Sequence, residues 1–231
     1  MIAARTFSTV RFSLVALSAL VVSPMVAAPV HASYVADTTY STNMEHVTIS
    51  FNGGGSETVY AGAFQTTLFD AKGMKASPTF HTYCVDLADE LKSKEIVNLN
   101  SIGCLAGGSG AYVGSLYANF AAKATSLVDQ AALQLAIWKT EYDGPNATSN
   151  CGHFTVLCAD PAVIAQAVCY YESNKLVCTN NVSYLQTACG EPGQSLMGPN
   201  AVPEPASLAM LGMGLVAGAG YTIRRRRLIA G

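Results

Sequence analysis

The chain has 231 residues and a formal net charge of −2, but its charges are unevenly distributed. Residues 33–201 hold seven lysines, no arginine and 14 of the 15 acidic side chains, a formal charge of −7. Nucleic-acid binding depends on clustered basic side chains, so this composition argues against a nucleic-acid partner and against docking on anionic lipid.

Residues 1–32 have the pattern of a secretory signal peptide. Arg5 and Arg11 give a positive start, and "FSLVALSALVV" is an apolar run too short to span a bilayer comfortably. Small residues around Val30 and Ala32 predict cleavage before Ser33 and export of the chain from Ser33 onward. An uncleaved membrane anchor is the alternative interpretation.

Residues 46–87 read as β-strands. The stretches "HVTISFN", "ETVYAGAFQTTLF" and "PTFHTYCVDL" are rich in Val, Thr, Tyr and Phe, which suit a pleated surface. Alternation along the third stretch predicts that Phe80, Thr82, Cys84 and Asp86 share one face.

A helix is predicted over residues 126–142. Ser126 and Asp129 form a typical N-terminal cap pair, and Asp143-Gly144-Pro145 is a stop signal. One apolar face is formed by Leu127, Ala131, Leu135, Trp138 and Tyr142. Gln134 lies one turn before Trp138, at the edge of this face, and is predicted to be half-buried.

All seven cysteines lie between residues 84 and 189, and five of them fall within 151–189. Export implies an oxidising compartment where cysteines form disulfides. Because the number is odd, at least one cysteine is outside the intramolecular disulfides or bonds to another chain. Cys84 stands apart from the cysteine-rich part, which is predicted to be loop-rich with a short helix at 160–172. The disulfide candidates are Cys104, Cys151, Cys158, Cys169, Cys178 and Cys189.

Residues 202–231 combine three features in a fixed order: Pro203-Glu204-Pro205, an apolar run over 206–223, and Arg224, Arg225, Arg226 and Arg227. The run is just long enough for a transmembrane helix, and the arginines place its end in the cytoplasm. The order resembles the PEP-CTERM sorting signal of Gram-negative bacteria. That resemblance implies transient anchoring in the inner membrane, then processing by an exosortase that releases or transfers the protein into the envelope or extracellular matrix. A plain C-terminal anchor is the alternative.

Two further motifs belong together: Tyr83-Cys84-Val85-Asp86 on a predicted strand, and Leu133, Gln134, Ile137 and Trp138 on the predicted helix. Over residues 45–145 they resemble bacterial thioester domains, as does the stretch 60–64. The resemblance implies a Cys84–Gln134 thioester that attaches the protein to an amine-bearing protein or polysaccharide surface, in adhesion or biofilm formation. Such a bond is used once, so no enzymatic turnover is expected, and no cofactor is implied.

Other interpretations of the same residues stay open. Cys84 and Gln134 could be a buried thiol or disulfide partner and a core amide, in a non-reactive, disulfide-stapled structural protein of the matrix or cell surface. A cysteine hydrolase would need a histidine beside Cys84, but His81 falls on the opposite strand face. The spacing of Cys151, His153 and Cys158 does not fit a zinc finger. Asp86, Asp89 and Glu90 favour a solvated turn over a calcium site.

These patterns together predict one exported α+β domain over residues 33–201. Its expected architecture is a β-sandwich or barrel-like sheet with a helical portion packed against it.

Overall fold

The computed structural model describes residues 33–40, 44–105, 108–145, 152–188 and 193–200. The predicted signal peptide and the sorting region, with its apolar run at 206–223, lie outside these ranges. Among the described residues, no helix has both the length and the apolar character needed to cross a bilayer. The secondary-structure elements are, in chain order, β1 (Ser33–Thr39), β2 (Glu45–Phe51), β3 (Ser56–Ala61), β4 (Phe64–Phe69), β5 (Phe80–Cys84), β6 (Lys94–Ser101), the 3-10 helix η1 (Ile102–Cys104), α1 (Gly110–Phe120), α2 (Leu127–Asp143), β7 (Phe154–Cys158), α3 (Pro161–Ser173), β8 (Val182–Thr187) and β9 (Leu196–Pro199).

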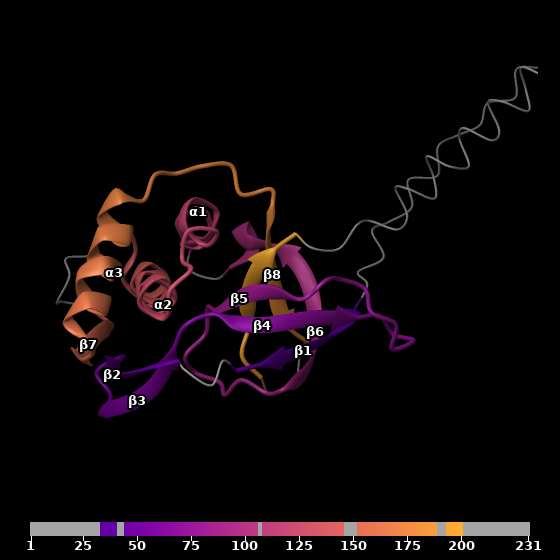
Figure 1. Ribbon diagram of the computed structural model, residues 1–231, viewed down its shortest axis with the longest axis horizontal. Helices are drawn as coiled ribbons and strands as arrows, with labels where there is room; N and C mark the ends of the chain where they lie inside the picture. The colour runs from indigo at the N-terminus through magenta and orange to yellow at the C-terminus, as the bar shows by residue number, and fades with distance from the viewer. Residues whose placement is uncertain (1–32, 41–43, 106–107, 146–151, 189–192, 201–231) are drawn as a thin grey trace, which may run out of the picture. The chain divides into compact units, whose positions relative to one another are not determined.

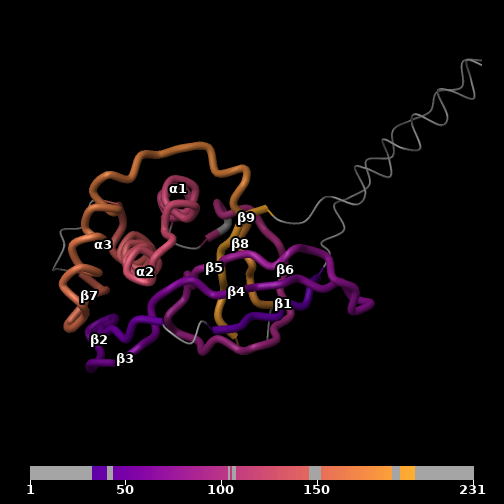
Figure 2. The backbone as a smooth tube through the Cα atoms, in the orientation of Figure 1, coloured from indigo at the N-terminus to yellow at the C-terminus, as the bar shows by residue number. Residues whose placement is uncertain are grey.

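Six strands close into an antiparallel barrel in the order β1-β4-β5-β9-β8-β6 (Figure 1). Strand β9 comes last in sequence but lies between β5 and β8 (Figure 2). Its Leu196 lies opposite Cys84 of β5. The predicted α+β class with a barrel-like sheet is confirmed. Because β9 closes the barrel beside β5, residues just before the sorting region become neighbours of Cys84.

A second sheet has three strands in the order β3-β2-β7. The strand-rich stretch 57–69 is divided between two strands that belong to different sheets. Ala61 ends β3 in the small sheet, whereas Phe64 begins β4 in the barrel. Gly62 between them has φ +155°, a conformation that favours glycine and turns the chain from one sheet to the other.

The predicted central helix is confirmed as α2, one residue shorter at its start and one longer at its end. The Ser126 hydroxyl accepts a hydrogen bond from the Asp129 amide (3.1 Å), and Gly144 ends the helix with φ +78°. All ten residues from 131 to 140 are buried, since α1, α3 and both sheets contact this helix. Gln134 is therefore fully buried, not half-buried, while Leu127 at the start of the predicted face is exposed. The short helix predicted at 160–172 corresponds to α3.

Candidate functional site

The structure brings Cys84 and Gln134 into direct contact although 50 residues separate them. Cys84 is the last residue of β5, Gln134 lies in the middle of α2, and both are essentially inaccessible to solvent. The Cys84 amide N–H donates to Gln134 Oε1 (2.9 Å), and Gln134 Nε2 donates to the Cys84 carbonyl oxygen (2.7 Å). The two hydrogen bonds hold the side-chain amide against the cysteine backbone.

The position of Gln134 follows from where strand β4 begins. Backbone groups of successive residues in an antiparallel strand face opposite neighbours. The Val85 amide donates to the Ser195 carbonyl beside β9 (3.1 Å), so the polar groups of Cys84 face the other side. There β4 offers no partner, because its pairing with β5 does not extend past Phe64. The Gln134 amide fills the place of the missing strand and satisfies both backbone groups.

A second glutamine, Gln194, contacts Cys84, and it does so at the sulfur. The Cys84 thiol donates to Gln194 Oε1, with 2.8 Å between Sγ and the oxygen, and Gln194 Nε2 donates to the Asp86 carbonyl. The backbone N–H of Gln194 lies 3.3 Å from Glu95 Oε1. Gln194 is itself buried. No motif in the sequence pointed to this residue, which lies 110 positions after Cys84.

The surroundings keep the Cys84 thiol protonated. Burial raises the pKa of the thiol well above its ordinary value, and the negative charges of Glu95 and Asp86 raise it further. Burial also raises the pKa of Glu95, against the lowering effect of the hydrogen bonds that it accepts from the Lys92 and Gln194 backbone. The sulfur therefore presents an S–H group at neutral pH, and a reaction at this sulfur must move that proton.

The other motif residues line the core around this pair. Tyr83 is buried, and burial raises the pKa of its phenol; its ring meets that of Tyr117 edge-on at 6.0 Å. Trp138 packs against Phe154 with ring centroids 6.0 Å apart. Leu133 and Ile137 are also fully buried. Apolar side chains thus exclude water from the contact between β5 and α2.

Glu141, like Glu95, has a carboxyl group with a shifted pKa, and it lies on α2 two turns after Gln134. Its Oε2 atom is buried and has no hydrogen-bond partner among the described residues. Burial, followed by the negative charge of Asp86, raises the pKa of Glu141 to about 8.

Replacing Glu141 with Gln is expected to flatten the pH dependence of stability. The native pKa lies above the unfolded value of about 4.3, so the folded protein binds the extra proton and stability falls as pH rises from about 4.3 to 8. The variant should be at least ~1 kcal/mol more stable than the wild type at pH 8 but not at pH 4. Urea unfolding across this range measures the effect, with the exposed Glu57→Gln as control. An unchanged pH slope in Glu141→Gln would contradict the assignment.

The alternative sites receive no support from the geometry. The His81 side chain is exposed, whereas Cys84 is buried, so the two do not form a catalytic pair. The described residues contain no group of His, Cys, Asp and Glu side chains arranged to hold a metal ion. Cys151, one of the three residues weighed for zinc, lies outside them. Asp86 accepts the Ala88 amide N–H (2.8 Å), as expected for a turn.

The predicted disulfides stay a prediction. Cys158, Cys169 and Cys178 are exposed and unpaired in the structure. Cys151 and Cys189 lie outside the described residues, as does the side chain of Cys104.

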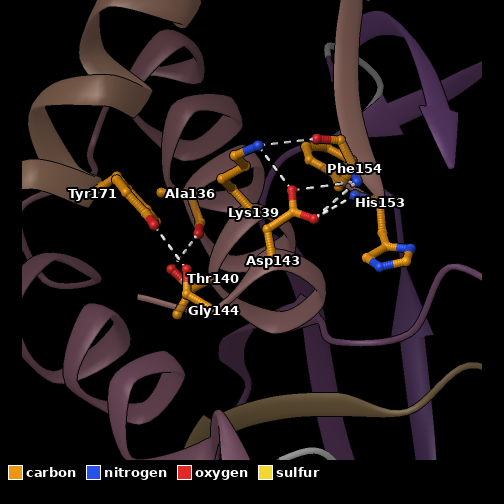
Figure 3. Close-up of polar contacts among 8 residues, drawn as sticks. All are labelled: Ala136, Lys139, Thr140, Asp143, Gly144, His153, Phe154 and Tyr171. Atoms are coloured by element: carbon orange, nitrogen blue, oxygen red, sulfur yellow. Dashed lines mark hydrogen bonds and ion pairs between the residues drawn. The ribbon is translucent and has the colours of Figure 1, made fainter. Parts of the chain in front are cut away.

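The two members of a buried ion pair at the end of α2 also form hydrogen bonds to the start of β7 (Figure 3). Lys139 Nζ lies 2.8 Å from Asp143 Oδ2 and also donates to the Phe154 carbonyl oxygen (3.2 Å). The Asp143 carboxylate in turn accepts backbone N–H groups from His153 and Phe154. This clamp fixes β7 on the helix that carries Gln134.

Comparisons with known proteins bear on the C-terminal residues. The PEP-CTERM protein-sorting motif matches residues 201–227. Neither a search of curated proteins nor a search of solved structures finds a significant match. The thioester-domain resemblance receives no support from these comparisons. The sorting motif marks the chain for export and exosortase processing, and so as a protein associated with the cell envelope.

Proposed function

We propose that the exported protein forms an internal thioester between Cys84 Sγ and the side-chain carbonyl carbon of Gln134, and uses it to attach covalently to an amine-bearing surface. The observation that carries this proposal is the pair of hydrogen bonds between the Gln134 amide and the Cys84 backbone, inside a core closed to solvent. They hold an electrophilic carbon beside the residue that bears the nucleophile.

Formation of the thioester needs no reagent beyond the two side chains. A C–S bond forms, the C–N bond of the Gln134 amide breaks, and the thiol proton leaves with the nitrogen as ammonia. An amide carbon is a weak electrophile, so the reaction depends on fixed geometry, which supplies up to ~7–11 kcal/mol of barrier reduction. The Cys84 N–H, 2.9 Å from Gln134 Oε1, is placed to stabilise negative charge on that oxygen in the tetrahedral intermediate.

Gln134 is the proposed acyl partner and not Gln194, although the contact of the sulfur is with Gln194 and the contacts of Gln134 are with the Cys84 backbone. An S–H donor to a carbonyl oxygen lies near the plane of the amide, where the oxygen lone pairs point. Attack on the carbonyl carbon comes from above that plane. The thiol therefore faces Gln194 as a hydrogen-bond donor, and Gln134 offers the activated carbonyl.

The thioester would survive until an amine reaches it, because water is excluded from the site. An incoming amine attacks the Gln134 carbonyl carbon, the C–S bond breaks, and the sulfur recovers a proton as a thiol. The product is a stable amide between Gln134 and the partner. Each molecule reacts once, at the cell surface or in the matrix to which the sorting motif directs it.

Intact mass spectrometry of the protein purified from exporting cells tests the proposal. We expect a mass lower by one ammonia than the disulfide-corrected sequence mass. Methylamine should convert this species into an adduct that maps to Gln134. Cys84→Ala is the control and should show neither the deficit nor the adduct. An alkylatable Cys84 thiol together with an unmodified, inert Gln134 would overturn the proposal.

A non-reactive structural protein of the envelope or matrix is the second candidate. It is favoured by the two hydrogen bonds of the Gln134 amide, which complete the β5 ladder without any reaction. This candidate predicts the inert outcome of the same experiment.

A further inference from the structure

We infer that Gln194 is the positioning residue for the Cys84 thiol, which makes residues 193–196, just before the sorting motif, part of the reactive site. This inference rests on the proposed thioester. It assigns a role to the "GQSL" stretch, which no sequence pattern explained.

Both ends of the Gln194 amide are engaged at the site. Oε1 accepts the Cys84 S–H at 2.8 Å, and Nε2 donates to the carbonyl of Asp86, two residues further along the chain. The side chain thus bridges the sulfur to the backbone beyond Cys84. A buried thiol can otherwise rotate about its Cα–Cβ bond, so this bridge fixes the direction in which the sulfur points.

The backbone of Gln194 is itself held by Glu95 from β6. Glu95 Oε1 accepts the N–H groups of Lys92 (2.7 Å) and Gln194 (3.3 Å). A Cβ atom on Gly193 would lie 2.5 Å from the same Glu95 oxygen, so a larger residue there would have to displace the carboxylate. Gly193 therefore lets the chain pass over the carboxylate, and Gln194 reaches the thiol from a supported backbone.

Ser195 and Leu196 extend this arrangement into the barrel. The Ser195 carbonyl accepts the Val85 N–H, and Leu196 pairs with Cys84 at the start of β9. Because β9 pairs with β5, Gln194, two residues before the start of β9, lies beside the end of β5.

The chemistry of a carboxamide limits what Gln194 does in the reaction. Its oxygen accepts a hydrogen bond from the neutral thiol, the form that burial favours, but the amide does not take the proton away. Gln194 therefore acts on the position of the sulfur and not as a base. Misplacement of a reacting atom by about 1 Å costs roughly 100-fold in rate.

The rate of ammonia loss after refolding under reducing conditions tests the inference in the full-length protein. Gln194→Met keeps the side-chain volume but loses both hydrogen bonds, and we expect thioester formation about 10- to 100-fold slower than in the wild type. Gln186→Met is the matched control, since Gln186 is exposed on β8 and its side chain accepts a hydrogen bond from Asn100. A normal rate in Gln194→Met would overturn the inference and leave the proposed thioester standing. A wild type that never loses ammonia would overturn both.

A pH profile separates positioning from a merely structural role. In Gln194→Glu, the new carboxyl group lies against the sulfur, and its ionisation adds negative charge there. We expect thioester formation in this variant to slow as pH rises through the pKa of that group, a titration absent from the wild type. A structural defect would instead slow the reaction equally at every pH and would overturn the inference. Should Gln194→Met not fold, Gln194→Asn replaces it, because its amide is one methylene too short to bridge the sulfur and the Asp86 carbonyl.

Discussion

Replacing Gln134 with Met is expected to abolish methylamine incorporation and to lower the free energy of unfolding by ~2–6 kcal/mol. The loss of incorporation follows from removing the acyl group. Relative to the form in which the Gln134 amide is unreacted, the loss of stability follows from the Cys84 N–H and C=O, which would both be left unpaired in the core at a cost of ~1–3 kcal/mol each. Methionine has nearly the volume of glutamine, so a cavity does not explain the change.

Urea unfolding followed by the fluorescence of Trp138, the single tryptophan of the chain, measures this cost. Gln130→Met is the control: Gln130 is half-buried one turn earlier on α2, and its replacement should change stability by no more than ~0.5 kcal/mol. Cys84→Ala should lose incorporation but keep both backbone hydrogen bonds, and so be destabilised less than Gln134→Met. Wild-type stability in Gln134→Met would show that the ladder contact is absent in solution.

Local signals in the sequence predicted the parts of the fold that depend on neighbouring residues. The Ser126 cap and the Gly144 stop place α2 within one residue at each end, because capping is decided within a single helical turn. The two motifs also predicted that Cys84 and Gln134 belong together, and the structure places them in contact. Whether they form a thioester stays a prediction.

Features that depend on the whole fold could not be predicted in this way. Periodicity assumes that a helix has one solvent-facing side, so it placed Gln134 at the edge of an apolar face. In the fold, α2 is covered on every side, and burial extends to its polar residues. Gln194 was missed because its contact with Cys84 exists only after β9 closes the barrel. No local pattern records a contact between residues 110 positions apart.

Asp143→Asn is expected to lower the free energy of unfolding by ~3–5 kcal/mol. The substitution leaves the Lys139 ammonium without its carboxylate, in a place where the lysine side chain is only 10% exposed. It also weakens the acceptor for the His153 and Phe154 N–H groups, which anchor β7 to α2 (Figure 3). Urea unfolding measures the loss, and proteolysis near residue 152 should become faster as β7 detaches.

Two comparisons test whether the buried charge causes this loss. Asp70→Asn is the matched control, because Asp70 also accepts two backbone N–H groups, from Lys72 and Met74, but in a more exposed turn. Asp70→Asn should lower the free energy of unfolding by ~1 kcal/mol. The double variant Lys139→Met/Asp143→Asn should be less destabilised than the sum of its single changes, since it removes both members of the ion pair. Strict additivity would instead mean that Asp143 acts only through the backbone of β7, and that the ion pair contributes nothing.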